Sequence, residues 1–292
     1  MLGFYISSLT LPPHPRPLPR KRGKGLRREL SRTGRVRGLN SKPETYFMRN
    51  IKLLIEYDGT NYHGWQVQPN GLTIQEVIEK KVEVMTGQHV RLIASGRTDA
   101  GVHALGQVAN FRTSASIPVE GFWRGLNSLL PPDIVIQSAE EVKTDFHAQH
   151  GVKRKTYRYL ILNQDPPSAI YRNYSWHIPL PLDVSAMQDA AGILLGKKDF
   201  STFRAANSDA NDPVREVFQA GWSVKEGKFL AFTIEADGFV KYMVRNIVGT
   251  LVEVGKGKIS ALEFQRILEA RDRRQAGITA PPQGLFLVEV KY

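Results

Sequence analysis

From position 51 onward, apolar and polar residues follow patterns that predict regular secondary structure. Residues 51–57 (IKLLIEY) form a mostly apolar run that is typical of a buried strand. Residues 73–85 place apolar side chains three and four positions apart, as on one face of a helix. Thr73 is a suitable N-cap for this helix, and Glu76 stands three positions later, where a capping box needs it. A strand followed by a helix is therefore the first predicted unit.

The same criteria extend this unit to six elements, which polar and glycine-containing segments separate. The further elements predicted in this half are strands at 90–94, 107–112 and 133–138 and a helix at 119–130. The resulting order, β-α-β-β-α-β, is that of a ferredoxin-like unit.

A second set of strands and helices follows in a similar order. Residues 225–227 (KEG) indicate a hairpin, Gly196 is suited to end one helix, and Ser260 is suited to cap another. The predicted strands are 155–163, 214–224, 228–236 and 285–290, and the predicted helices are 183–195, 239–254 and 261–271. The repeat is one of element order, without convincing residue identity between the halves.

These patterns predict an α/β protein of the α+β type. We expect two ferredoxin-like (RRM-like) halves, whose mixed and largely antiparallel sheets flank a central active-site cleft. Residues 1–47 are expected to be separate from both halves. The predicted N-terminal α/β domain spans 48–152 and the predicted C-terminal α/β domain spans 153–292. A cleft between two packed sheets would suit a long, folded substrate.

The formal net charge of +12 is concentrated near the start of the sequence. Residues 1–47 hold 11 of the 40 Lys and Arg residues and only two acidic residues. From Met48 onward, 29 basic and 26 acidic residues leave a net charge of +3. The body of the protein is therefore only mildly basic, and charge alone gives a weak indication of a nucleic-acid partner.

Residues 1–47 differ from the rest of the chain in composition. The Pro- and Arg-rich stretch 11–28 (LPPHPRPLPRKRGKGLRR) shows no amphipathic period, and we expect it to be disordered. Three interpretations are open: a mis-assigned start with translation beginning at Met48, a basic RNA-binding arm, or a targeting peptide. We favour the start at Met48, because the first clean strand pattern follows it directly.

The composition excludes several kinds of protein and site. The chain contains no cysteine, which excludes disulfides and thiolate metal sites and fits a reducing, cytoplasmic location. No apolar run approaches the ~18 residues that a membrane span needs. His147 and His150 stand at H-x-x-H spacing, but they have no clear third ligand, and we expect no metal.

Candidate chemistry concentrates in the loop 95–103 (SGRTDAGVH), which lies between two predicted strands. Glycines flank Asp99 on both sides, and such a loop can present a carboxylate rigidly to a ligand. An arginine beside this aspartate would lower its pKa and keep it ionised, as a nucleophile or a base requires. An ordinary loop with an Asx-turn at Asp99 is the alternative, and spacing alone does not decide between the two.

The run 96–104 (GRTDAGVHA) closely resembles the catalytic motif of the tRNA pseudouridine synthase A family. Companion segments resemble the same family in the same order, from about Ile51 to the C-terminus. They are 56–59 (EYDG), 64–66 (GWQ), 145–148 (DFHA), 158–159 (RY), 199–204 (DFSTFR) and 243–249 (MVRNIVG). Residues 1–47 have no counterpart in the family, which supports a start at Met48.

The resemblance implies roles for four side chains. Asp99 matches the catalytic aspartate, the nucleophile, and Arg97 matches the arginine thought to help displace the target base from its stem. Arg245 matches the arginine that pairs with the aspartate. Tyr157 matches the tyrosine that stacks on the flipped uracil, although Tyr159 points to the same face of a strand and is an alternative.

The resemblance also implies a reaction and a substrate. Uridine is isomerised to pseudouridine: the N1–C1′ bond breaks, the uracil turns, and C5 joins C1′, so no cofactor is expected. Asp99 could attack C1′, add to C6 or remove the 2′ proton, and the sequence does not choose among these routes. The implied partner is tRNA, bound by a homodimer and modified in the anticodon stem-loop at uridines 38, 39 and 40.

Further contacts to RNA are expected from dispersed basic residues. The candidates form three clusters: Lys153, Arg154 and Lys155, then Lys197 and Lys198, and then Arg271, Arg273 and Arg274. A solvated surface is the alternative interpretation of each cluster. Two other functions also stay open. One is a non-catalytic RNA-binding module, which leaves the Asp99 loop unexplained, and the other is a related synthase acting at other tRNA uridines.

Overall fold

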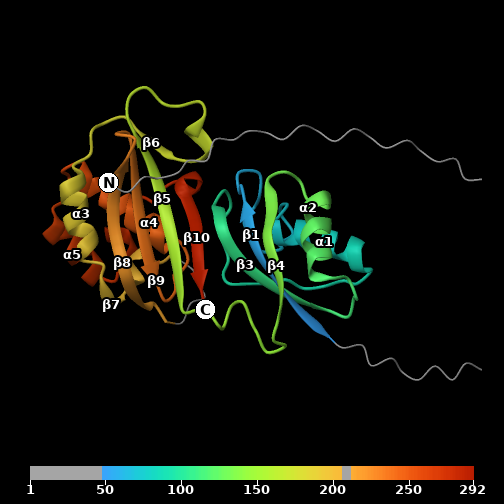
Figure 1. Ribbon diagram of the computed structural model, residues 1–292. Coiled ribbons are helices and arrows are strands. Elements are labelled where there is room, and N and C mark those ends of the chain that lie inside the picture. Colours follow the sequence, from blue (N-terminus) through green and yellow to red (C-terminus); the bar gives the residue numbers. More distant parts are fainter. Residues whose placement is uncertain (1–47, 206–211) are drawn as a thin grey trace, which may run out of the picture. The chain divides into compact units, whose positions relative to one another are not determined.

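In the computed structural model, which describes residues 48–205 and 212–292, strand β10 (Leu285–Lys291) lies between strands from both halves of the chain (Figure 1). It pairs in parallel with β3 (His103–Thr113) and antiparallel with β5 (Arg154–Asn163). Within the described residues, the strands therefore form one ten-stranded sheet with the main order β4-β1-β3-β10-β5-β9-β8-β7. The short strands β2 and β6 pair with β3 and β5, respectively.

The predicted α+β class with largely antiparallel strands is confirmed, but the two sheets are not separate. In the described chain, only the pairs β3–β10 and β5–β6 are parallel. An unpaired strand edge exposes a row of N–H and C=O groups. Strand β10 pairs along most of its length with β5 and, through Phe286 and Leu287, with the first two residues of β3. The two halves consequently share a continuous hydrogen-bonded sheet.

The N-terminal half follows the predicted pattern closely. Its elements are β1 (Arg49–Tyr57), α1 (Ile74–Thr86), β2 (Ile93–Ala94), β3, α2 (Val119–Leu129) and β4 (Ile134–Val142). Alternate side chains of β1 from Ile51 to Tyr57 enter the core, as expected of a strand. Thr73 caps α1 by accepting a hydrogen bond from the Glu76 N–H, and Gly87 ends the helix in the left-handed region at a φ of 68°.

The C-terminal half contains more elements than predicted. Its strands are β5, β6 (Trp176–Ile178), β7 (Gly196–Asp199), β8 (Val214–Lys225), β9 (Phe229–Ala236) and β10, and its helices are α3 (Val184–Gly192), α4 (Met243–Gly255) and α5 (Ala261–Glu269). Short 3₁₀ helices occupy Tyr171–Asn173, Ser201–Phe203, Arg273–Gln275 and Pro282–Gly284. Ser260 and Glu263 form a complete capping box at α5. The predicted hairpin joins β8 to β9 through Glu226 and Gly227, both at positive φ.

Three predicted boundaries were wrong. Helix α4 begins at Met243 and not at residue 239, because Tyr242 adopts a left-handed conformation with a φ of 66°. Helix α3 ends at Gly192, three residues before the predicted end, and Gly196 opens β7 instead. The strand predicted at 90–94 is reduced to the two residues of β2.

The described residues belong to one compact unit that begins near Tyr46. The predicted boundary between residues 152 and 153 therefore stays a prediction about folding units, and the predictions for residues 1–47 lie outside the described residues. Among the described residues, no helix is both long and apolar enough to cross a membrane.

Candidate active site

The loop between β2 and β3 is fixed by hydrogen bonds to buried side chains. The Ser95 hydroxyl donates to Gln107 Oε1 at 2.6 Å, and the Gln107 amide donates to the Gly96 carbonyl at 2.9 Å. The hydroxyls of Tyr57 and Thr98 share a hydrogen bond of 2.7 Å. Because Gln107 and Tyr57 belong to the core, these bonds hold the loop on a rigid part of the sheet.

A second segment of the resemblance, 64–66, packs directly against this loop. The backbone N–H of Trp65 donates to the Thr98 carbonyl at 3.1 Å. Gly64 has a φ of 84°, and a Cβ atom at this position would stand 2.5 Å from the Thr98 oxygen. Only glycine allows this backbone contact, which braces the loop immediately before Asp99.

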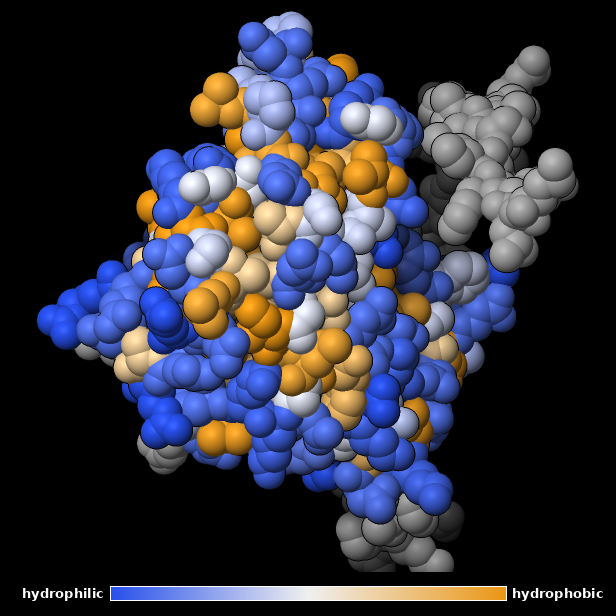
Figure 2. Space-filling model, turned by 90° about the vertical axis from the view of Figure 1, so that its left-hand side faces the viewer, coloured by the Kyte–Doolittle hydropathy of each residue, from blue (hydrophilic) through white to orange (hydrophobic). Residues whose placement is uncertain are grey.

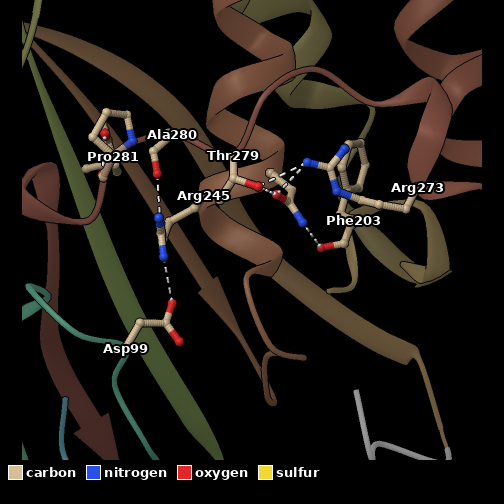
Figure 3. A network of polar contacts seen from close by, with 9 residues as sticks. Asp99, Phe203, Arg245, Arg273, Thr279, Ala280 and Pro281 are labelled. Carbon is tan, nitrogen blue, oxygen red and sulfur yellow. Dashed lines mark hydrogen bonds and ion pairs between the residues drawn. The ribbon is translucent and has the colours of Figure 1, made fainter. Parts of the chain in front are cut away.

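The loop presents Asp99 to an arginine from the other half of the chain (Figure 3). Arg245, on the first turn of α4, places Nη1 3.1 Å from Asp99 Oδ2. The Nε of Arg245 donates to the Ala280 carbonyl at 2.7 Å, so the guanidinium is held at two points. The side chains of Asp99 and Arg245 are only 25% and 13% exposed, so water screens this ion pair weakly.

Burial raises the pKa of the Asp99 carboxyl above its ordinary value, although the positive charges of Arg245 and Lys241 act in the opposite direction. The sequence-based expectation of a lowered pKa was therefore wrong. It considered the neighbouring arginine and omitted the loss of hydration in a loop that the rest of the fold encloses. Asp99 is a carboxylate whose charge depends on the placement of Arg245.

The structure distinguishes the two tyrosines of β5. Tyr159 is fully buried, and its hydroxyl donates to the Pro281 carbonyl at 2.7 Å. Tyr157 packs edge-on against Phe239 with ring centroids 5.0 Å apart, and its hydroxyl has no hydrogen bond within the described residues. Burial is the main cause that raises the pKa of Tyr157, and the charge of Asp99 is one of the smaller causes. Of the two tyrosines, Tyr157 is the one whose pKa responds to the Asp99 charge, and the hydroxyl of Tyr159 is already bonded to the Pro281 carbonyl.

Arg97 lies in the same loop, two residues before Asp99, and is exposed. The structure therefore joins Asp99 and Arg245 in an ion pair and leaves Arg97 at the surface in the same loop. Tyr157 is related to this pair through the effect of the Asp99 charge on its pKa.

Lys155, one of the predicted RNA contacts, is directed into the protein. Its ammonium donates to the Ser95 carbonyl at 2.7 Å. The missing side chain of Gly96 leaves room for it, since a Cβ atom there would stand 2.6 Å from Lys155 Nζ. Burial, and to a smaller extent the charge of Arg215, lower the pKa of Lys155 to about 8. Lys155 therefore stabilises the Asp99 loop through a hydrogen bond to its backbone.

The other predicted basic residues have different surroundings. Arg154 forms an ion pair of 2.9 Å with the buried Glu235, and its guanidinium stacks over the Phe218 ring at 4.0 Å. Lys153 is exposed. Lys197 and Lys198 lie on the edge strand β7, four strands from β10, and line an open pocket of about 360 Å³ together with Arg271.

The histidine pair considered as a metal site takes part in a local turn. The rings of His147 and His150 pack with centroids 4.1 Å apart, and Nδ1 of His147 accepts backbone N–H groups from the following turn.

Sequence reasoning missed several residues around Asp99. The Gln107 amide donates to the loop, the Ala280 carbonyl accepts from Arg245, and the charge of Lys241 acts on Asp99. These three residues lie in separate segments of the sequence. Lys241 stands just before the 243–249 segment of the resemblance, and this proximity was the one available signal.

Comparison with known proteins agrees with this geometry. A family model described as tRNA pseudouridine synthase matches residues 53–150 and 190–292, which include both the Asp99 loop and α4. The chain belongs to the tRNA pseudouridine synthase family. It is therefore an enzyme of the isomerase class, and the resemblance found in its motifs is confirmed.

Members of the tRNA pseudouridine synthase family match this chain over their full length. A protein of Acetivibrio thermocellus named tRNA pseudouridine synthase A is 53% identical over 245 residues, covering 84% of this chain and 100% of the relative. Proteins of the same name from Thermoanaerobacter sp. and Geotalea daltonii are 50% and 51% identical over the same coverage.

The environment of Lys155 predicts a pH-dependent contribution to stability in this synthase. Its pKa of about 8 in the folded protein lies below the ordinary value of 10.5. Between these pH values the unfolded chain binds more protons, so the free energy of unfolding rises with pH. We expect the wild type to gain stability relative to Lys155→Met as pH increases from about 8 to about 10.5, measured by urea unfolding.

Lys153→Met is the matched control, because this lysine is exposed two positions away. It should show no such pH-dependent difference. A constant offset between the wild type and Lys155→Met across this pH range would contradict the buried position of the ammonium.

Proposed function

We propose that this chain isomerises uridine to pseudouridine at positions 38, 39 and 40 of the tRNA anticodon stem-loop, with Asp99 as the catalytic carboxylate. Membership of the family supports the reaction class, and the matching motifs support the substrate. No cofactor is required, because the reaction rearranges atoms of the substrate without net oxidation or reduction.

The Asp99–Arg245 ion pair carries this proposal. A nucleophile or base must be ionised, yet a site that excludes water favours the neutral acid. Arg245 opposes the effect of burial at a distance of 3.1 Å, and the Ala280 carbonyl fixes its orientation. This arrangement supplies a charged carboxylate on a rigid loop, which an ordinary surface aspartate does not provide.

The reaction balances without a second carboxylate. The N1–C1′ bond breaks and leaves the electron pair on uracil, whose carbonyl groups delocalise the charge. After the ring turns, C5 joins C1′, the C5 hydrogen leaves as a proton, and N1 takes up a proton. A glycosidase needs a second acid or base because it must also activate water, which has to be excluded here.

The remaining active-site residues fit the handling of a base taken out of a helical stem. We propose that the exposed Arg97 occupies the space that the uridine leaves, and that the Tyr157 ring stacks on the extruded uracil. Tyr157 is held edge-on by Phe239 and has only 8% of its surface exposed, so it would bind uracil with little loss of side-chain freedom.

We further propose that the enzyme acts as a cytoplasmic homodimer. The absence of cysteine supports a reducing compartment. Figure 2 views the C-terminal half from the side of α3 and α5 and shows apolar residues exposed across this face. Exposed apolar side chains in this half include Leu180, Leu195, Val224 and Leu262. Apolar surface of this kind favours association, and a single-chain mass in sedimentation equilibrium would contradict the dimer.

The role of Asp99 predicts the outcome of a tritium-release assay. Forming the C5–C1′ bond expels the C5 hydrogen, so tRNA labelled with tritium at C5 of uridine reports the reaction directly. We expect Asp99→Ala and Asp99→Asn to reduce release by about 10³-fold or more, because the reacting carboxylate is lost. Binding of tRNA, measured by filter retention, should persist.

Asp189→Asn is the matched control, since Asp189 is an exposed aspartate of α3. It should release tritium at the wild-type rate. Equal release by all variants would remove Asp99 from the chemistry. No release by the wild type on a full set of unmodified tRNAs would favour a non-catalytic RNA-binding module.

The proposed specificity predicts where the product appears. After reaction with unmodified tRNAs, chemical mapping of pseudouridine should find it at positions 38, 39 and 40 and nowhere else. Pseudouridine confined to other positions would indicate a related synthase with a different site choice and would leave the role of Asp99 intact.

The two lysines of β7, of which Lys197 is exposed and Lys198 half-buried, are proposed to contact the RNA backbone, together with Lys153. Each phosphate contact contributes about 0.9 to the slope of log affinity against log salt concentration for a duplex. Replacing Lys197 and Lys198 with glutamine should weaken tRNA binding and lower this slope by up to about 2. The same change at Lys80 and Lys81, an adjacent pair on α1, should alter neither quantity. An unchanged slope in the β7 variant would show that these lysines are only solvated.

A further inference from the structure

A segment that precedes β10, residues 276–281, lies along helix α4 and forms a strap over its first two turns. The Gly277 N–H donates to Thr250 Oγ1 at 2.9 Å, and the Ala280 N–H donates to the Arg245 carbonyl at 3.1 Å. The strap is therefore bonded to the helix near both of its ends.

Between these two hydrogen bonds, the backbone of the strap lies in direct contact with the backbone of α4. A Cβ atom on Gly249 of α4 would stand 1.8 Å from the Ile278 carbonyl oxygen. A Cβ atom on Gly277 would stand 2.9 Å from the Gly249 oxygen. Glycine at both positions lets the strap reach the helix backbone, so the distance between the two is set by main-chain atoms.

A buried asparagine of α4, Asn246, is bonded to the centre of the strap. Figure 3 labels its three partners, Phe203, Thr279 and Arg273. Asn246 is fully buried, and its Nδ2 donates to the Phe203 carbonyl at 2.8 Å. Its Oδ1 accepts hydrogen bonds from Thr279 Oγ1 at 2.7 Å and from Arg273 Nη2 at 3.1 Å. Phe203 fixes which way the amide faces, and its oxygen therefore points to the strap.

Arg273 completes this polar network. Its Nη2 also donates to Thr279 Oγ1 at 3.0 Å, and its Nη1 donates to the Ala276 carbonyl at 3.3 Å. Burial lowers the pKa of Arg273, and its guanidinium is partly buried where it makes these hydrogen bonds. Within the described residues no carboxylate pairs with it, so its bonds to the strap and to Asn246 are its polar contacts.

The end of the strap contains the Ala280 carbonyl, which holds Arg245, the ion-pair partner of Asp99. The Ala280 carbonyl accepts from Arg245 Nε at 2.7 Å, which leaves Nη1 directed at Asp99 Oδ2. Thr279 immediately precedes Ala280 in the chain, so a shift of Thr279 would be transmitted to the Ala280 carbonyl and through it to the guanidinium.

We propose that Thr279, Asn246 and Arg273 are positioning residues for the reaction, because they fix the carbonyl that aligns Arg245 with Asp99. None of the three needs to touch the substrate. The inference deepens the proposed function and rests on it where activity is concerned, but the alignment of Arg245 can be measured without any substrate.

Thr279→Val tests this network with little change in side-chain volume, and Thr279→Ser retains the hydroxyl. The first readout is the pKa of the Asp99 carboxyl, followed by ¹³C NMR on protein labelled at aspartate and assigned with Asp99→Asn. Arg245 lowers this pKa, so its misalignment should raise the pKa by about one unit in Thr279→Val. In Thr279→Ser, which keeps the hydroxyl, the pKa of Asp99 should equal the wild-type value.

The second readout is the kinetics of tritium release. Misplacing a catalytic group by about 1 Å can reduce turnover about 100-fold, so kcat of Thr279→Val should fall by about 10- to 100-fold. The dissociation constant for tRNA should stay within about twofold, because no RNA contact is removed. Activity requires ionised Asp99, so the loss of kcat on acidification should begin at a higher pH.

Thr144→Val is the matched control, because Thr144 is an exposed threonine outside this network. It should leave the pKa, kcat and binding unchanged. A lower melting temperature in Thr279→Val with an unchanged Asp99 pKa and unchanged kcat would show that the network only stabilises the fold. Weaker tRNA binding with unchanged kcat would also overturn the inference.

Failure of the proposed function gives a different pattern. If the wild type releases no tritium but the Asp99 pKa rises in Thr279→Val and returns in Thr279→Ser, the alignment of Arg245 stands and the catalytic proposal falls. If Thr279→Val does not fold, Arg273→Lys takes its place, because it keeps the charge and removes the second hydrogen-bonding arm.

Discussion

The pairing of β10 with both β3 and β5 is the interaction on which the geometry of the candidate active site depends. The Asp99 loop is anchored to β2 and β3, whereas Arg245 stands on a helix of the C-terminal half. Their 3.1 Å contact requires the two halves to be fixed relative to each other with similar accuracy. A shared sheet fixes the relative position of two halves through backbone hydrogen bonds, in addition to the close packing of side chains. A strand that belongs in sequence to one half and pairs with the other provides this connection here.

Around this ion pair, the fold balances two opposing electrostatic effects. Excluding water suits a reaction whose intermediate must not be hydrolysed, but it also disfavours the charged carboxylate. A partly buried ion pair is stable only when further hydrogen bonds satisfy its remaining groups. Arg245 meets this condition through the Ala280 carbonyl, and Lys155 stabilises the other side of the loop through the Ser95 carbonyl. Arg245 and Lys155 are thus each held by a backbone oxygen, whose position depends on the fold and not on a flexible side chain.

Local features of this protein could be predicted from sequence, and features that depend on distant contacts could not. The caps at Thr73 and Ser260 and the hairpin between β8 and β9 follow from neighbouring residues, and the structure has them. The Asp99–Arg245 contact was predicted only because both segments resemble one family. The parallel position of β10 leaves no signal in its own seven residues.

The same distinction holds for individual charges. Lys153, Arg154 and Lys155 are adjacent in sequence and were grouped as one basic cluster. In the sheet, successive side chains point to opposite faces, so Arg154 meets Glu235 and Lys155 meets the Ser95 carbonyl. The direction in which the pKa of Asp99 is shifted likewise depends on burial, which cannot be read from the spacing of residues in the sequence.

The pairing of β10 with a strand far away in the sequence also has a kinetic consequence. Phe286 and His103 are partners across a separation of more than 180 positions (286 against 103), which gives the sheet a high contact order and predicts slow folding. In a chain in which β10 has not yet paired, β5 and the start of β3 have open edges. Open strand edges favour wrong association, and these edges lie beside the candidate active site.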